Sequence, residues 1–247
     1  MAIRNRVVLI TGGSRGIGRG IALRFAQEGA RVALAYRSNK AAAQQTLRQI
    51  QTVGADCVAV ETDITVPARA EQLVQTVVDR FGRVDILVNN VGDFRWGVLA
   101  DSSVEEWNQI FSSNLQSVFY MCRAVLPHMR KGRWGRIINM GAVGAERAFG
   151  QAKISAYAAA KAAVVALSRS LALEEAKNGI TVNVVNPSNI DEKELTLNEA
   201  RRMKDARFPI GRPPTAEDVA AAALFFASEE SEYVTGQVVN VSGGWML

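Results

Sequence analysis

The chain has 247 residues, of which 48% are hydrophobic and 21% are charged, a balance typical of a globular protein with a substantial core. The formal net charge is only +5 and the charges are spread along the chain, which disfavours a nucleic-acid-binding protein and suits a small anionic ligand. No apolar run approaches the roughly 20 residues that span a bilayer, and no signal peptide is apparent, so we expect a cytoplasmic protein that binds no membrane. Two cysteines and one histidine support neither a disulfide framework nor a metal site, so we expect no bound metal.

Apolar, β-branched segments alternate with longer helical patterns through the first half of the chain. In the first helix, Ile17, Ile21 and Phe25 recur every four residues, and Gly29 ends it. The predicted strands are 7–10, 31–35, 57–60 and 84–88, and the predicted helices are 17–29, 40–53 and 66–81.

The second half continues the same alternation. Helices are predicted over 103–129, about 156–177 and 215–227, and strands over 135–139, 180–185 and 237–241. Continuously apolar strands joined by helices predict a parallel sheet covered on both faces, so we expect one doubly wound α/β domain over residues 1–247. Only the charged segment of about 188–214 interrupts the pattern, and we interpret it as a loop or lid over the substrate.

A glycine-rich turn lies between the first strand and the first helix, where a dinucleotide-binding motif must lie. Gly12 permits a tight turn, Gly16 lets the backbone approach a pyrophosphate, and Gly18 lets the helix pack on the strand. The turn is Thr11-Gly12-Gly13-Ser14-Arg15-Gly16-Ile17-Gly18.

The end of the second strand indicates which dinucleotide binds. NAD enzymes usually place an acid there for the ribose hydroxyl, whereas this chain has Arg37, which can converge with Arg15 on a 2′-phosphate and favours NADPH. Asp63 is expected beside the adenine. Asn90 follows the fourth strand, where its amide can bond the backbone of the turn, the adenosine ribose or both.

These motifs, together with Tyr157 and Lys161 four residues apart, occur in the order found in the short-chain dehydrogenase/reductase family, which the whole chain resembles. The branch it resembles most is that of the 3-oxoacyl-(acyl-carrier-protein) reductases. The resemblance implies a Rossmann-like sheet of seven strands, a homotetramer, and hydride transfer between NADPH and a carbonyl compound. The cofactor-binding residues expected from the turn, the second strand and the resemblance are Gly12, Ser14, Arg15, Gly16, Ile17, Gly18, Arg37, Asp63, Asn90, Val91, Gly92, Pro187 and Ile190.

The resemblance also assigns three catalytic residues. Tyr157 would donate the proton, and Lys161 would bind the nicotinamide ribose and lower the pKa of Tyr157 by its positive charge. Asn114 would hold a water that relays protons to Lys161.

The chain departs from this family at Ala142, which stands where a serine usually bonds the substrate oxygen, and the stretch from Asn139 to Tyr157 is about two residues longer than in the related reductases. Three explanations remain open. A neighbour such as Ser155, or a group in the inserted loop, replaces the serine; the substrate does not need it, as for a pterin or imine; or the chain binds NADPH and turns over weakly. A second departure follows the sixth strand, where Ser188 and Glu192 replace a glycine and a threonine.

The substrate predicted from these observations is a 3-oxoacyl thioester or a small ketone, delivered free, on coenzyme A or on acyl carrier protein. A basic cluster ends the long helix, where such reductases bind the acidic carrier: Arg130, Lys131, Arg133 and Arg136. Apolar residues on the two long helices are expected to pair across a dimer interface: Ile110, Leu115, Val118, Phe119, Val164, Leu167 and Leu171.

Overall fold

The computed structural model describes residues 3–191 and 194–246 and contains a seven-stranded sheet whose strands are all parallel. The strand order is β3-β2-β1-β4-β5-β6-β7, which confirms the predicted single α/β sheet. The order reverses beside β1, so the ends of β1 and β4 flank a switch point of the kind where nucleotides bind. The strands are β1 (Val7–Thr11), β2 (Arg31–Tyr36), β3 (Cys57–Glu61), β4 (Ile86–Asn89), β5 (Gly135–Met140), β6 (Ile180–Pro187) and β7 (Val238–Val241).

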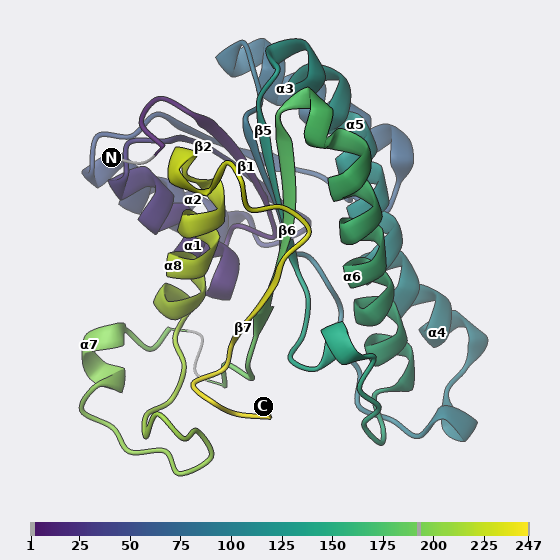
Figure 1. The fold of residues 1–247 in the computed structure, drawn as a ribbon. Coiled ribbons are helices and arrows are strands. Elements are labelled where there is room, and N and C mark those ends of the chain that lie inside the picture. The colour runs from purple at the N-terminus through teal and green to yellow at the C-terminus, as the bar shows by residue number, and fades with distance from the viewer. Residues whose placement is uncertain (1–2, 192–193, 247) are drawn as a thin grey trace.

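Helices cover both faces of the sheet (Figure 1). On one face, α1, α2 and α8 pack over the strands, and on the other face α3, α5 and α6 do so. The helices are α1 (Gly16–Gln27), α2 (Lys40–Thr52), α3 (Pro67–Phe81), α4 (Val104–Phe111), α5 (Ser117–Gly132), α6 (Ser155–Glu175), α7 (Leu197–Ala200) and α8 (Ala216–Ala227).

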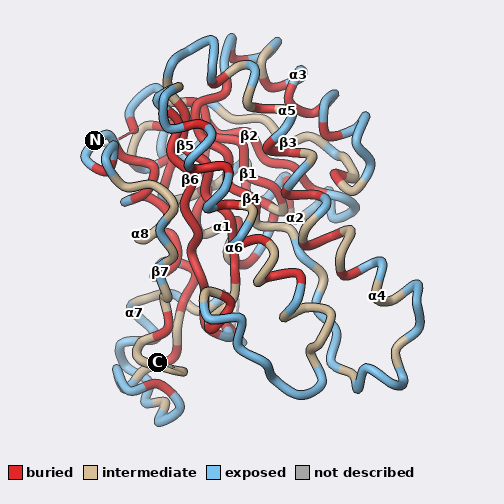
Figure 2. Tube along the Cα trace, turned by 45° about the vertical axis from the view of Figure 1, so that its right-hand side comes forward, coloured by how far each residue is buried: buried red, intermediate tan, exposed pale blue. Residues whose placement is uncertain are grey.

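The central strands are buried on both sides, as Figure 2 shows in red. In β1, Val8 and Ile10 join the core under α1 and α8, whereas Val7 and Leu9 join the core under α3 and α5. This period of two with both faces apolar explains why the strands read as continuous hydrophobic runs in the sequence.

The helix predicted over 103–129 differs from the prediction in its middle and at its end. A π-helical turn, Ser112–Gln116, separates α4 from α5, and α5 continues to Gly132. The cause lies in Asn114, whose Nδ2 donates to the Ile110 carbonyl at 3.0 Å, the acceptor that its own N–H would use in a regular α-helix. A π turn of this kind displaces one residue from the helical repeat, and here that residue is a predicted catalytic one.

The described part of segment 188–214 is packed against the domain. Ile190, Ala200 and Phe208 are buried, and α7 forms within the segment. Glu194 forms an ion pair with Arg19 of α1 at 2.6 Å. This segment therefore lies against the helix that follows the glycine-rich turn.

Residues 155–178 form a helix long and apolar enough, by length and composition alone, to cross a membrane. Val164, Leu171 and Ala172 of this helix belong to the core beneath α3 and α5. We therefore interpret it as a core helix of the domain.

Candidate active site

The glycine-rich turn has the geometry of a dinucleotide cradle. Gly12 and Gly16 have φ values of +63° and +54°, which side-chain-bearing residues rarely adopt. A β-carbon on Gly18 would lie 2.3 Å from the carbonyl oxygen of Gly12, so the helix approaches the turn this closely only with glycine there. Arg15 precedes α1 without capping it by its side chain, which leaves the first N–H groups of the helix free for an anion.

Asn90 holds this turn in place. Its Nδ2 donates to the carbonyls of Thr11 and Gly12, both at 3.2 Å, and its backbone N–H donates to the Thr11 hydroxyl at 2.9 Å. Val91 packs beside it, with its Cγ2 atom 3.2 Å from where a β-carbon on Gly12 would be. The Asn90 amide therefore bonds the backbone of the turn, and a bond to the adenosine ribose stays a prediction.

The expected 2′-phosphate site lies on the exposed side of the turn. Arg15 and Arg37 are both exposed, and Ser14 is buried, with its carbonyl accepting from Thr46 at 3.0 Å. Asp63 caps its own loop by accepting from the Thr65 hydroxyl at 2.7 Å. Burial alone would raise the pKa of Asp63, but these hydrogen bonds and the charge of Arg37 lower it, which indicates that Arg37 and Asp63 lie near each other.

Tyr157 and Lys161 lie one turn apart at the start of α6. The Nζ atom of Lys161 donates to the carbonyl of Met140, at the end of β5, at 2.8 Å and lies 5.6 Å from the centre of the Tyr157 ring. Burial lowers the pKa of Lys161 to about 8 and raises the pKa of Tyr157 to about 12. The rise in the Tyr157 pKa comes from desolvation of the buried phenol, and the lowering expected from the charge of Lys161 stays a prediction.

Asn114 reaches the same place from the π turn. A β-carbon on Gly92 would lie 2.3 Å from Oδ1 of Asn114 and 3.4 Å from Nζ of Lys161. The Nδ2 atom of Asn114 is occupied by the carbonyls of Ile110 and Asp93, whereas Oδ1 is buried without a partner among the described residues. The three predicted catalytic residues are thus brought together, and Oδ1 of Asn114 is available to accept a hydrogen bond beside Lys161.

A buried chain of polar side chains supports this region and was not predicted. Asn89 donates to Asn139 at 2.8 Å, and Asn139 donates to Ser168 of α6 at 2.8 Å. These bonds link β4, β5 and α6, the three elements next to the catalytic residues. The sequence did contain a signal for this chain, since Asn89 and Asn139 each lie at the end of a predicted apolar strand.

The loop that carries Ala142 is fixed by Glu146. Its carboxylate accepts from the side-chain amides of Asn186 on β6 and Asn240 on β7, both at 2.9 Å, and the neighbouring Arg147 donates to the Met246 carbonyl at 2.7 Å. Burial alone would raise the pKa of Glu146, but the hydrogen bond from Asn240 and further bonds lower it. The inserted loop is therefore an ordered part of the site.

Ser155 could replace the missing serine only if its segment were not helical, because in a helix a side chain two residues before Tyr157 points in another direction. It is the first residue of α6, so the segment is already helical there, although Ser155 lines a small pocket together with Tyr157. Among the residues expected to clamp the nicotinamide, Pro187 ends β6 and Ile190 is buried in the core. Glu192 lies outside the described residues.

Two aromatic residues beside Tyr157 were missed in the sequence. The Phe94 ring meets the Tyr157 ring edge-on, with centroids 5.0 Å apart, and Trp96 follows with its centroid 5.8 Å from that of Phe94. The pocket next to them extends along Leu99, Trp107, Ile110 and Ile154. Their position directly after the Asn-Asn-x-Gly motif was the only signal in the sequence.

The predicted basic cluster at the end of α5 is only partly available to a partner. Arg136 is buried and lies over the Trp134 ring, and Arg130 pairs with the carboxylate of Glu175. Only Lys131 and Arg133 remain as exposed charges without an ion pair among the described residues.

The apolar residues assigned to a dimer interface are also mostly used within the chain. Val118, Val164 and Leu171 belong to the core beneath α3 and α5, and Ile110 is buried. Phe119 alone among those named is exposed, at 47%. Within residues 3–191 and 194–246, no group of three or more His, Cys, Asp or Glu side chains is placed to hold a metal ion.

Comparisons with known proteins show which family the chain resembles over its whole length. Residues 12–246 match the family described as enoyl-(acyl carrier protein) reductase. The chain is 39% identical over 249 residues to the 3-oxoacyl-(acyl-carrier-protein) reductase FabG of Salmonella typhimurium, covering 100% of both. Among solved structures, it resembles a proposed 3-oxoacyl reductase of Bacillus thuringiensis (TM-score 0.91, 34% identity, 98% and 99% of the two chains) and the acetoin dehydrogenase YohF of Salmonella typhimurium (TM-score 0.87, 31% identity, 98% and 96%).

Proposed function

Because the chain belongs to the short-chain dehydrogenase/reductase family of oxidoreductases, we propose that it is an NADPH-dependent reductase of a carbonyl substrate, either a 3-oxoacyl thioester or a small ketone. The observation that carries this proposal is the convergence of Asn114 and Lys161 around Gly92, one helical turn from Tyr157. A phenol, an ammonium and a free amide oxygen at one place are the groups that deliver a proton and replace it.

The residues of the turn fit a dinucleotide. A β-carbon would fill the space at Gly18, and the helix N-terminus at Gly16, which no side chain caps, suits a pyrophosphate. Arg15 and Arg37 would hold the 2′-phosphate of NADPH, and Pro187 and Ile190 would lie beside the nicotinamide. When bound, the dinucleotide supplies the hydride that the carbonyl carbon receives.

The side chains supply the proton. As the carbonyl carbon accepts the hydride and becomes an alcohol carbon, the hydroxyl of Tyr157 donates its proton to the carbonyl oxygen. The charge of Lys161 stabilises the phenolate that this transfer leaves, and the free Oδ1 of Asn114 positions a water that returns a proton through Lys161. A pKa of about 12 keeps Tyr157 protonated, and therefore able to donate, at neutral pH.

Ala142 offers no hydrogen bond to the substrate oxygen. Loss of one such donor typically costs about 10²–10³ in rate, so this site depends more strongly on Tyr157 than a site with the serine does. A C=N substrate, as in a pterin or imine, is the second candidate that this residue favours, and a weakly catalytic NADPH-binding protein is the third.

The decisive experiment measures NADPH oxidation with an acetoacetyl thioester by the native chain and by Ala142→Ser. Ready turnover by the native chain would establish a carbonyl reductase that works without the serine. Turnover only by Ala142→Ser, with a dihydropterin or cyclic imine reduced by the native chain, would favour the second candidate. NADPH binding without oxidation of any of these would leave the third.

The proposal extends to a cytoplasmic homotetramer, as the resemblance implies. Light scattering would show a particle of about four chains of 26.8 kDa each, and a single-chain mass would contradict it. Acyl carrier protein and coenzyme A are the two proposed carriers of a thioester substrate, and only the first would require the exposed charges of Lys131 and Arg133.

A further inference from the structure

The segment directly after β4 holds two large aromatic side chains at the surface. Phe94 and Trp96 are each 55% exposed, an unusual position for rings of this size beside a buried catalytic pair. Because Phe94 and Trp96 are two residues apart and their ring centres lie 5.8 Å apart, they project to the same side of the segment. Arg95 between them forms an ion pair with Glu106 on α4.

The backbone that carries these rings is held firmly. The N–H of Asp93 donates to the Ser113 hydroxyl at 3.1 Å, and the Asp93 carbonyl accepts from Nδ2 of Asn114 at 2.8 Å. On the other side of the rings, the N–H of Gly97 donates to the Lys153 carbonyl at 2.8 Å. The backbone on both sides of the rings is therefore anchored within the domain, which reduces the entropy lost when a ligand packs on this segment.

The position of the rings connects them to the chemistry. Phe94 meets the Tyr157 ring edge-on at 83°, with the centroids 5.0 Å apart, so an aromatic ring packed on Phe94 lies next to the proton donor. The adjoining pocket is lined by Tyr157 and the apolar side chains Leu99, Trp107, Ile110 and Ile154, and its remaining lining includes the charged or polar residues Arg95, Ser102, Glu106, Lys153 and Ser155. Since Ala142 offers no hydrogen bond to the substrate oxygen, apolar contacts must do more of the orienting here.

We propose that Phe94 and Trp96 are specificity-determining residues that select ketones whose carbonyl group is attached to an aromatic ring. Ring–ring contacts at centroid separations of 4.5–7 Å contribute binding free energy beyond that of the area they bury. In an aryl ketone the ring is conjugated with the carbonyl group, so ring and carbonyl lie in one plane when the ring packs against Phe94. The proposal rests on the proposed reductase function and names the substrate class that this site prefers.

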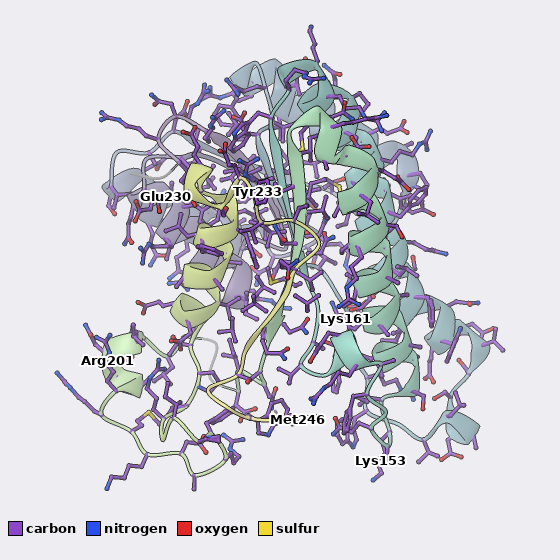
Figure 3. All side chains as sticks on the ribbon, in the orientation of Figure 1. Lys153, Lys161, Arg201, Glu230, Tyr233 and Met246 are labelled. Carbon is purple, nitrogen blue, oxygen red and sulfur yellow. The ribbon has the colours of Figure 1, made fainter. Side chains whose placement is uncertain are left out.

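The test compares acetophenone with cyclohexyl methyl ketone, which share a carbon skeleton and differ only in whether the ring is aromatic. Values of kcat/KM for both are measured with the native chain, Phe94→Leu and Trp96→Leu, which keep apolar bulk but remove the rings. Comparing each variant with the native chain cancels the different intrinsic reactivity of the two ketones. Tyr233→Leu is the matched control, since Tyr233 is fully exposed and lies away from the labelled Lys161 and Lys153 (Figure 3).

We expect Phe94→Leu to lower kcat/KM for acetophenone roughly 2- to 10-fold, mainly through a higher KM, and to leave cyclohexyl methyl ketone nearly unchanged. Trp96→Leu should act in the same direction, and Tyr233→Leu should change neither ketone. An equal fall for both ketones would mean that Phe94 only supports the fold of the site, and no change for either would mean that the rings do not contact the substrate. Each of these two results overturns the proposal.

A second readout separates this proposal from the proposed function. Binding of acetophenone to the protein saturated with NADP⁺ is followed by saturation-transfer NMR, which needs no turnover. If acetoacetyl thioester is reduced but acetophenone neither binds nor reacts, the reductase stands and the aromatic preference is wrong. If no compound is reduced, the proposed reductase function is wrong. The aromatic preference is then judged from binding alone, and it is supported if Phe94→Leu binds acetophenone more weakly than Tyr233→Leu does.

Discussion

Gly92 and Asn114 lie so close that a β-carbon on the glycine would stand 2.3 Å from the amide oxygen of the asparagine. Substituting Gly92 by alanine must displace Asn114 or the segment after β4, and displacements of about 1 Å can cost roughly 100-fold in rate. We expect Gly92→Ala to lower kcat for NADPH oxidation by about that factor while the protein stays folded by circular dichroism. Gly132→Ala at the end of α5 is the control, because a β-carbon there would meet nothing within 4 Å, and equal losses in both variants would contradict the prediction.

Tyr157→Phe removes the proposed proton donor and leaves the ring that contacts Phe94. General acid catalysis typically contributes 10²–10⁴, so turnover should fall by at least about 100-fold. NADPH binding, measured by the fluorescence of the bound cofactor, should change little. Undiminished turnover would rule out Tyr157 as the donor.

Lys161→Met should make the protein more stable at pH 7 while it abolishes turnover. The folded pKa of about 8 lies below the ordinary value of 10.5, so below pH 8 the folded state keeps a buried charge that the unfolded state exposes to water. The native chain should therefore gain stability between pH 8 and 10.5, by at most about 3 kcal/mol, and Lys161→Met should lack that rise. Chemical denaturation at pH 7 and pH 10 measures this, with the exposed Lys131→Met as control.

The pH dependence of turnover should follow the same lysine. Deprotonation of Lys161 near pH 8 removes the charge that stabilises the phenolate, whereas Tyr157 stays protonated up to about pH 12. We expect kcat/KM for carbonyl reduction to be level below pH 8 and to fall above it. A profile that stays level to pH 10 would show that the charge of Lys161 is not needed.

Arg37→Ala should weaken NADPH and spare NADH. Charge-assisted hydrogen bonds contribute about 1.5–3 kcal/mol, which corresponds to a rise of roughly 10- to 100-fold in the KM for NADPH. Arg48→Ala makes the same change of charge at another exposed position, on α2, and should leave both cofactors unaffected. If both variants raise the KM for NADPH alike, the effect is one of overall charge rather than of a binding site.

Much of this molecule follows from local patterns. The strands were found from runs of β-branched residues such as Val7–Ile10, because both faces of the sheet are buried and every position is apolar. The glycine turn and the Tyr157–Lys161 pair could be placed because their spacing is set by chain geometry within one element. The edges of elements moved by up to three residues, as at β4, which begins at Ile86 rather than Val84, and at α5, which ends at Gly132 rather than 129.

What could not be predicted depends on contacts between distant segments. The π turn arises because the side chain of Asn114 donates a hydrogen bond to the Ile110 carbonyl, and the helical pattern of 103–129 does not predict this bond. The pKa of Tyr157 depends on burial by other elements, and Phe94 reaches Tyr157 across 63 positions of sequence. Likewise, the sequence places Arg130 and Arg136 in a charged cluster, but in the folded chain Glu175 pairs with Arg130 and the Trp134 ring packs against Arg136.

The hydrogen bonds that Glu146 accepts from Asn186 and Asn240 depend on residues that are synthesised late. During translation, the glycine turn and its partner Asn90 are both synthesised within the first 90 residues, so the groups that form this bond are present early. The loop bearing Ala142 must wait for β7, which is synthesised last, and Arg147 must wait for Met246. A nascent chain that stalls before residue 240 therefore lacks the bond from Asn240 to Glu146 and the bond from Arg147 to Met246, and of these partners only Asn186 is left to hold this loop.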